Sequence, residues 1–297
     1  MNASRAAPQT VREWLRHTEQ CFRRARLWYG HGTHSARDEA AWLLTHVLRL
    51  SHARFAQSLQ RKLTPAERRA VLKLIGRRVR TRRPLAYLLH EAWLGEHRFY
   101  VDQRVIVPRS FIAELLRDGL APWIADIGRV RNVLDMCTGS GCLAVLLALA
   151  FPRATVVATD VSRPALEVAR RNVRAYRLGQ RIRLVRADLF TGLPPAQYDL
   201  IVANPPYVDA RAMRALPKEY SFEPKLALAG GADGLRFAGQ ILRSAARFLR
   251  PKGLLVVEIG HNRRALERAF PSIPFTWLET SAGDSFVFLV SREDLSC

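Results

Sequence analysis

The chain has 297 residues, of which 48% are hydrophobic and 25% are charged, a balance typical of a soluble globular protein. Its 47 basic and 26 acidic residues give a formal net charge of +21, which favours a polyanionic partner such as nucleic acid unless it reflects only a compositional preference for arginine. No stretch of 18 apolar residues is free of charge, and the first residues lack the apolar core of a secretory signal, so we expect a cytoplasmic protein without membrane contact.

The four cysteines are scattered, without a CxxC pair or a neighbouring histidine cluster: Cys21, Cys137, Cys142 and Cys297. This spacing argues against a zinc site, and we expect no bound metal. Scattered thiols in a chain of this length are typical of a reducing compartment. Cys137 and Cys142 flank a glycine-rich turn, where we interpret them as small apolar fillers.

Residues 8 to about 89 are predicted to be helical, because apolar residues recur there at helical spacing. Thr64, Pro65 and Glu67 predict a helix start, with Thr64 as the N-cap and Glu67 reaching back to it. The helix that follows carries a dense basic run, which Pro84 ends: Arg68, Arg69, Lys73, Arg77, Arg78, Arg80, Arg82 and Arg83. Such a run is either a solvated face that suits the helix dipole or a polyanion contact.

Residues 91–107 predict strands around a turn, because β-forming residues such as Phe99, Val101, Val105 and Val107 are frequent there. From residue 131 onward, strands are expected at 131–135, 154–160, 181–188, 198–204, 253–260, 275–280 and 285–291. Helices are expected between them at 141–150, 163–176, 235–249 and 262–269. This alternation predicts a doubly wound, mostly parallel sheet with a ligand crevice at the carboxyl ends of its strands. We therefore expect a helical domain at 1–89, a β-hairpin linker at 90–110 and a Rossmann-like α/β domain with a seven-stranded sheet at 111–297.

The turn after the first strand of the α/β domain is rich in glycine and reads Asp135-Met136-Cys137-Thr138-Gly139-Ser140-Gly141. Glycine permits a tight turn and a close approach of a ligand to the backbone. No Lys-Ser/Thr pair follows, as a nucleotide P-loop requires, and Ala144 stands where the dinucleotide fingerprint has its third glycine. The turn therefore suits a nucleoside ligand without phosphates, and S-adenosylmethionine is such a ligand.

Acidic residues end the next two predicted strands. Asp160 is placed to bind both ribose hydroxyls, as the acidic residue does in dinucleotide folds. Asp188 is placed to accept a hydrogen bond from an adenine amino group, with Leu189 packing on the ring. The alternative for either aspartate alone is a helix N-cap, but three acidic or glycine features at three successive strand ends favour a nucleoside site.

The tetrad Asn204-Pro205-Pro206-Tyr207 directly follows the fourth strand. An amide nitrogen is a poor nucleophile because its lone pair is delocalised, so it needs acceptors that hold its N–H groups and orient the lone pair. The Asn204 side-chain oxygen and the Pro205 carbonyl are predicted to supply them, with the prolines fixing the loop and Tyr207 packing on the planar target group. The tetrad therefore predicts methyl transfer to a planar amine or amide nitrogen.

Together these motifs resemble the N(5)-glutamine methyltransferases, which modify proteins of translation, and the resemblance covers nearly the whole chain. It extends beyond the tetrad to segments 99–101, 107–109, 220–224 and 227–235. It implies a small helical substrate-recognition domain, a β-hairpin linker and a class I methyltransferase domain. The expected cofactor-binding residues are Asp135, Thr138, Gly139, Ser140, Gly141, Asp160, Asp188, Leu189 and Asn204, and the expected catalytic residues are Asn204, Pro205, Pro206 and Tyr207.

The family has two main bacterial branches, one acting on the GGQ glutamine of peptide release factors and one on a glutamine of the large-subunit ribosomal protein L-three. Release-factor enzymes typically carry a Pro-Arg-Pro-x-Thr-Glu segment, whereas this sequence reads Pro108-Arg109-Ser110-Phe111-Ile112-Ala113-Glu114. Segments 135–142 and 216–220 also look like the ribosomal-protein branch, although that branch usually has Ser-Pro where Ser110-Phe111 stands here. The resemblance favours ribosomal protein L-three, or its assembly intermediate, as the partner, with the basic helical domain on ribosomal RNA.

Two other functions stay open at this point. A DNA or RNA methyltransferase acting on an exocyclic amine uses the same tetrad and suits the positive charge, although no sizeable target-recognition domain follows the catalytic core. The second is a non-enzymatic RNA-binding assembly factor with a vestigial cofactor fold.

Overall fold

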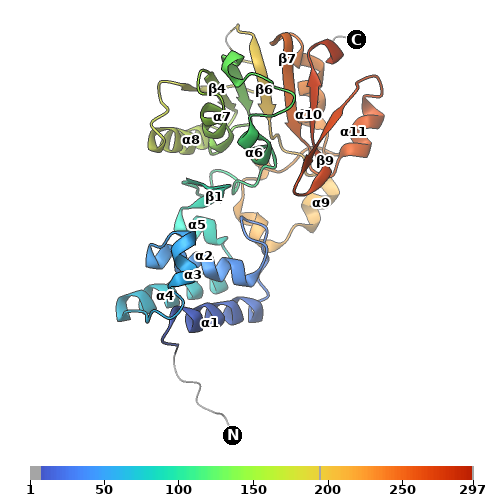
Figure 1. Ribbon diagram of the computed structural model, residues 1–297. Coiled ribbons are helices and arrows are strands. Elements are labelled where there is room, and N and C mark those ends of the chain that lie inside the picture. The colour runs from blue at the N-terminus through green and yellow to red at the C-terminus, as the bar shows by residue number, and fades with distance from the viewer. Residues whose placement is uncertain (1–7, 194, 296–297) are drawn as a thin grey trace. The chain divides into compact units, whose positions relative to one another are not determined.

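The computed structural model describes residues 8–193 and 195–295, which form two compact units (Figure 1). The first unit comprises Met1–Glu91 and Pro217–Phe222, and the second comprises Ala92–Leu216 and Glu223–Cys297. The inclusion of Pro217–Phe222 in the first unit is a feature that the sequence did not predict. Cys297 lies outside the described residues.

The first unit is helical, as expected. Its elements are α1 (Val11–Arg24), α2 (Ala36–Leu48), α3 (His52–Gln57), α4 (Pro65–Thr81), α5 (Leu85–Leu89) and the 3-10 turn η3 (Lys218–Phe222). The predicted start of α4 is confirmed, because the Thr64 hydroxyl accepts the N–H of Glu67 while the Glu67 carboxylate accepts the N–H of Thr64. The helix ends at Thr81, where Arg82 takes a left-handed conformation before Pro84.

The basic run on α4 is only partly exposed, which corrects its interpretation as one continuous basic face. Arg78 is 1% exposed, and its Nε donates to Glu39 Oε1 at 2.6 Å. Arg82 pairs with the fully buried Glu219 at 2.6 Å, and Glu219 also accepts the N–H of Trp28. These ion pairs serve the core of the first unit, and they fasten Pro217–Phe222 to it.

The second unit begins with the hairpin β1 (Ala92–Leu94) and β2 (His97–Phe99) and continues as an α/β domain. Its strands are β3 (Asn132–Met136), β4 (Thr155–Asp160), β5 (Ile182–Arg186), β6 (Tyr198–Ala203), β7 (Leu249–Glu258), β8 (Thr276–Thr280) and β9 (Gly283–Ser291). Its helices are α6 (Ile112–Leu115), α7 (Cys142–Ala150), α8 (Arg163–Ala175), α9 (Ala210–Ala215), α10 (Arg236–Ala245) and α11 (Arg263–Ala269). The 3-10 turns are η1 (Leu116–Asp118), η2 (Ile127–Arg129), η4 (Lys225–Ala227) and η5 (Glu293–Leu295).

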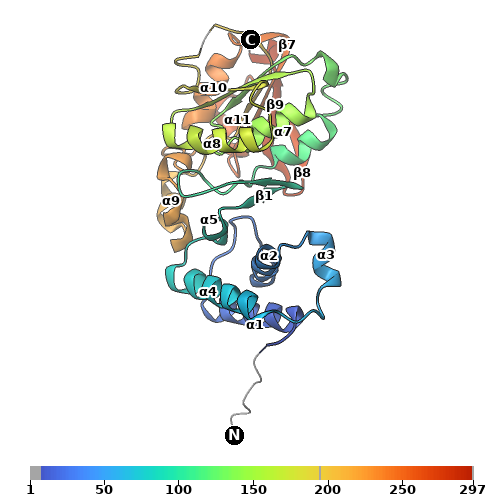
Figure 2. The same cartoon turned by 90° about the vertical axis from the view of Figure 1, so that its left-hand side faces the viewer.

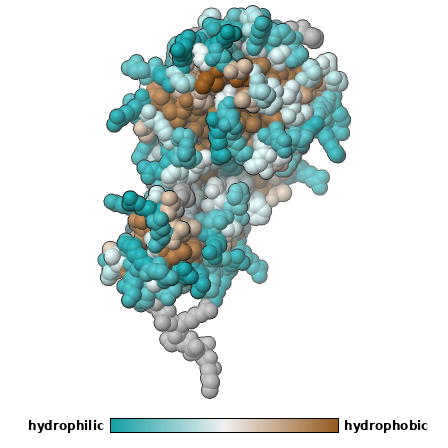
Figure 3. Space-filling model, in the orientation of Figure 1, coloured by the Kyte–Doolittle hydropathy of each residue, from teal (hydrophilic) through white to brown (hydrophobic). Residues whose placement is uncertain are grey.

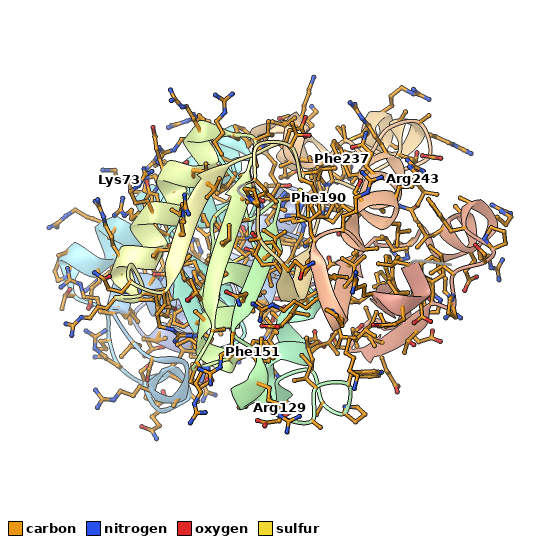
Figure 4. All side chains as sticks on the ribbon, turned by 90° about the horizontal axis from the view of Figure 1, so that it is seen from above. Lys73, Arg129, Phe151, Phe190, Phe237 and Arg243 are labelled. Carbon is orange, nitrogen blue, oxygen red and sulfur yellow. The ribbon has the colours of Figure 1, made fainter. Side chains whose placement is uncertain are left out.

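The sheet has seven strands in the order β5-β4-β3-β6-β7-β9-β8, which confirms the predicted fold class. β3 to β7 are parallel, and β8 and β9 are antiparallel additions at one edge. Helices α6, α7 and α8 cover one face, while α10 and α11 cover the other (Figure 2). Phe151 packs in the core of the first face, and Phe190 and Phe237 lie on the opposite side (Figure 4).

Several element boundaries differ from the sequence prediction. Only Ala92–Leu94 and His97–Phe99 form strands within 91–107, so Val101, Val105 and Val107 are buried outside any sheet, with Val105 closing a turn through its N–H bond to the Asp102 carbonyl. α10 ends at Ala245 and β7 starts at Leu249, because Leu249 already pairs with Tyr198 ahead of a register shift. Among the described residues, no helix has the length and apolar character needed to cross a membrane.

Candidate functional site

A cavity of about 250 Å³ opens at the carboxyl ends of β3, β4, β5 and β6, at the edge where the strand order predicts a crevice. It is lined by residues from each of those strand ends and by segments 104–106, 224–227 and 236–240. Six predicted site residues border it: Gly139, Asp160, Asp188, Leu189, Asn204 and Pro206. The other predicted site residues, Asp135, Thr138, Ser140, Gly141, Pro205 and Tyr207, are not among the residues that line it.

The glycine-rich turn is held by bonds to its own residues and to neighbouring elements. Asp135 is fully buried and accepts the Thr138 hydroxyl, and burial raises the pKa of its carboxyl to about 7. The Ser140 carbonyl accepts the side-chain amide of the buried Asn172 at 2.8 Å. A Cβ at Gly141 would lie 3.0 Å from the Ala169 Cβ, so glycine permits α7 to approach α8. These residues shape the turn and do not line the cavity.

Asp160 is the acidic group most firmly oriented toward the cavity. One carboxylate oxygen accepts the N–H of Gly139 at 2.9 Å, and the other accepts the N–H of Ser162 at 2.8 Å. Burial raises the pKa of this carboxyl, while the two N–H groups favour its ionised form. The two oxygens have lone-pair sites beyond these backbone bonds, which suits a ligand that presents two hydroxyl groups.

Two non-glycine residues of the lining adopt left-handed backbone conformations. Cys137 has φ +57° and Leu189 has φ +49°, and both border the cavity. A non-glycine residue in the left-handed backbone region raises the free energy of the folded state by roughly 1–2 kcal/mol, and residues in this conformation cluster at ligand sites. Burial raises the pKa of the Cys137 thiol, so this cysteine is a neutral part of the wall.

Three glycines allow neighbouring segments to pack closely against Tyr207 in the 204–207 loop. An added Cβ would lie 2.7 Å from the Tyr207 Cα at Gly230, 2.5 Å from the Tyr207 carbonyl oxygen at Gly234, and 2.7 Å from the Tyr207 ring at Gly260. The Asn262 side chain donates to the same carbonyl at 2.9 Å. Segment 227–235, noted in the sequence only as part of a resemblance, therefore fixes the position of the loop.

The Asn204 side chain differs from its neighbours in having no hydrogen bond to any residue that the structure describes. It is half-buried at the end of β6 and borders the cavity, whereas Pro205 behind it is buried. Its amide is thus available to a bound molecule.

Glu258, which the sequence analysis did not single out, stands behind Tyr207 at the end of β7. It is fully buried and accepts the Ser110 hydroxyl at 2.6 Å, the N–H of Phe111 at 2.9 Å and the Tyr207 hydroxyl at 3.3 Å. Burial raises the pKa of the Glu258 carboxyl to about 7 from an ordinary value of 4.5. The tyrosine ring is therefore oriented from behind by a carboxylate 51 residues further along the chain.

This raised pKa predicts a pH-dependent stability. Between pH 4.5 and about 7 the folded protein binds more protons at Glu258 than the unfolded chain does, so the free energy of unfolding should fall as pH rises through this window. The Glu258→Gln variant should reduce that slope by up to about 1.4 kcal/mol per pH unit, because glutamine keeps an acceptor oxygen but does not titrate. Asp135, whose carboxyl pKa is also raised, contributes equally to the pH dependence of stability in the variant and in the unaltered protein.

Urea unfolding below, within and above this window measures the slope. The exposed Glu279→Gln variant is the matched control and should retain the pH dependence of the unaltered protein. Parallel stability curves for Glu258→Gln and the unaltered protein would contradict the assignment.

Two motif segments that are separate in the sequence meet beside the cavity. Arg109 forms a bidentate pair with Glu223, with both N···O distances at 2.7 Å, and Glu223 also accepts the N–H of Val107. Glu223 is 3% exposed, so its role is to hold segment 107–109 against 223–227. The Asp233 carboxylate accepts the N–H of Leu235, so it too has a structural role, in the loop at 230–235.

Comparison with known proteins places the chain among methyltransferases. The family models that match are the PrmC N-terminal domain at residues 13–89 and the methyltransferase small domain at residues 118–219. The ribosomal protein uL3 glutamine methyltransferase of Neisseria meningitidis is 57% identical over 96% of this chain and 94% of that protein. Those of Bordetella pertussis and Bradyrhizobium diazoefficiens are 52% and 46% identical, over 99% and 96% of this chain and 99% and 92% of theirs.

Proposed function

Because the chain belongs to the ribosomal protein uL3 glutamine methyltransferases, we propose that it transfers a methyl group from S-adenosylmethionine to the side-chain amide nitrogen of a glutamine in ribosomal protein uL3. The observation that carries this proposal is relatedness along the full length, in both units, to proteins with that name. It supports the ribosomal-protein branch over the release-factor branch and over a nucleic-acid methyltransferase. A ribosomal-protein substrate also supports action in the cytoplasm.

The cavity chemistry fits S-adenosylmethionine. Two carboxylates, Asp160 and Asp188, lie among mostly apolar side chains of its lining, which suits a nucleoside that carries a cationic sulfonium and no phosphate; the lining also includes Arg104 and Arg236. Asp160 would bind the ribose hydroxyls, Asp188 the adenine amino group, and Leu189 the face of the ring, while Gly139 admits the ligand close to the backbone. Asp135, Thr138, Ser140 and Gly141 would act indirectly, by fixing the shape of the turn.

When bound, the cofactor supplies an electrophilic methyl group. The protein's task is to present the glutamine nitrogen to it, and positioning is the main catalytic device for such a transfer. The Asn204 side-chain oxygen and the Pro205 carbonyl would accept the two N–H groups of the target amide and turn its lone pair toward the methyl group. Pro206 keeps the loop rigid, and Tyr207 would pack on the amide plane, held by Glu258.

The basic surface of α4 remains our proposal for a contact with ribosomal RNA in an assembling particle, although it is smaller than the sequence predicts. Arg78 and Arg82 are committed to Glu39 and Glu219. Arg69, Lys73 and Arg80 are exposed, and they are the residues that would reach phosphates.

Methyl transfer from labelled S-adenosylmethionine tests the function directly. The purified chain is incubated separately with uL3, with a peptide release factor and with protein-free ribosomal RNA. We expect label on uL3 alone, on one glutamine that mass spectrometry identifies. Label on the release factor or on RNA instead of uL3 would overturn the proposal.

A further inference from the structure

Helix α8, on the surface of the second unit, carries a row of exposed arginines. Arg163, Arg170 and Arg174 are separated by seven and four residues, which places them within about 40° of one another around the helix. Arg177, also exposed, lies in the turn that follows the helix. Figure 2 shows α8 on the outside of the sheet, and Figure 3 shows hydrophilic side chains along the edge of the unit where it lies. We call these four residues the α8 arginine row.

The charge of the second unit is concentrated around this row. The unit contains 27 basic and 19 acidic residues, a formal charge of +8. Residues 163–186 alone contain eight arginines and one glutamate, a charge of +7, which leaves 19 basic and 18 acidic residues elsewhere in the unit. A general compositional preference for arginine would spread the excess over the whole unit, so it does not explain this concentration.

The row is not neutralised by the fold. Arg163, Arg170, Arg174 and Arg177 form no ion pair with any residue of 8–193 or 195–295. Other arginines of the segment do have structural roles. Arg181 donates to the carbonyls of Phe151 and Ala154. The one acidic residue, Glu167, already pairs with Arg104 at 2.8 Å.

We propose that the α8 arginine row binds the phosphate backbone of RNA. Unpaired guanidinium groups in a row are the groups that nucleic-acid interfaces use for phosphate contacts. Protein–protein interfaces also use arginine, but they combine it with aromatic residues and methionine in an apolar core. None of the large exposed hydrophobic side chains among the described residues lies on α8. These observations favour RNA over an acidic protein.

The position of the row connects it to the reaction. Ser162, which directly precedes Arg163, lines the cavity and caps α8. If the proposed function holds, RNA on α8 would bring a glutamine of an RNA-associated substrate next to the cavity. This consequence rests on the proposed function, whereas RNA binding by the row does not.

A charge-reversal experiment tests the proposal. Arg170→Glu with Arg174→Glu is compared with Arg264→Glu and Arg268→Glu, an equally spaced exposed pair on α11 on the opposite face of the sheet. Binding of a fluorescent RNA hairpin of unrelated sequence is measured over a range of salt concentrations. We expect the α8 pair to weaken binding by about tenfold or more and to lower the slope of log K against log salt by roughly 1.5–2.

The α11 pair should change the affinity by about twofold at most, because charges beyond the Debye length of about 8 Å are screened. Equal losses for both pairs, no binding by the unaltered protein, or equal competition by polyglutamate would overturn the proposal. Methyl transfer to free uL3 is measured in parallel. Because hairpin binding needs no methyl transfer, failure of the RNA proposal and failure of the proposed function are distinguished.

Discussion

The Asn204→Ala variant is expected to turn over about 10²- to 10³-fold more slowly than the unaltered protein, the loss typical when one preorganised polar contact to a reacting group is removed. The variant loses the side-chain oxygen that we propose to hold the target amide. Asn204 makes no hydrogen bond to the described part of the chain, so the change removes little support from the fold. Thermal unfolding should therefore be nearly unchanged.

Separate measurements of kcat and of cofactor affinity establish what Asn204 does. Isothermal titration calorimetry should show that the cofactor Kd rises far less than kcat falls, since Asp160, which keeps its backbone bonds, is the proposed ribose ligand. Asn204→Asp retains one side-chain oxygen and should lose less activity than the alanine variant. If kcat survives, or if the loss equals the fall in cofactor affinity, Asn204 does not position the amide.

The sheet could be predicted because its strands are apolar runs that end at chemically distinctive residues. The positions of Asp160, Asp188 and Asn204 at one edge follow from strand order alone, since the carboxyl ends of parallel strands meet. Short elements escaped prediction for a physical reason. α6 and α9 contain four and six residues, too few for a helical period to stand out.

The support behind the site could not be predicted, because it joins residues that are distant in sequence. Glu258 meets Tyr207 across 51 residues and Ser110 across 148, and Arg109 meets Glu223 across 114. No local pattern signals such pairs. The hint that the sequence offers is a lone glutamate in an apolar run, two residues before Gly260, and only the three-dimensional contacts give Glu258 a role.

Arg78, in the first unit, is a second residue whose role local sequence patterns do not reveal. Helical periodicity places it in a basic run, although it is a core residue. Its guanidinium donates to Glu39, to the carbonyl of Arg82 at 2.8 Å and to the carbonyl of Trp28 at 3.1 Å, and it lies 3.9 Å from Glu219. Burial raises the pKa of the Glu39 carboxyl, and the charge of Arg78 opposes that shift. Glu39 therefore depends on Arg78 for charge compensation, whereas Glu219 also has Arg82 at 2.6 Å.

The Arg78→Met variant should destabilise the first unit by about 3–5 kcal/mol, because it leaves the buried Glu39 carboxylate without its partner. Hydrogen exchange of α2 and α4 peptides in the full chain measures this loss within the unit itself. The exposed Arg80→Met variant on the same helix is the matched control and should stay within about 0.5 kcal/mol of the original. Combining Arg78→Met with Glu39→Gln should restore part of the loss, since one uncompensated charge disappears. A loss for Arg78→Met no larger than that for Arg80→Met would mean that the buried pair contributes little, and that apolar packing alone holds α2 against α4.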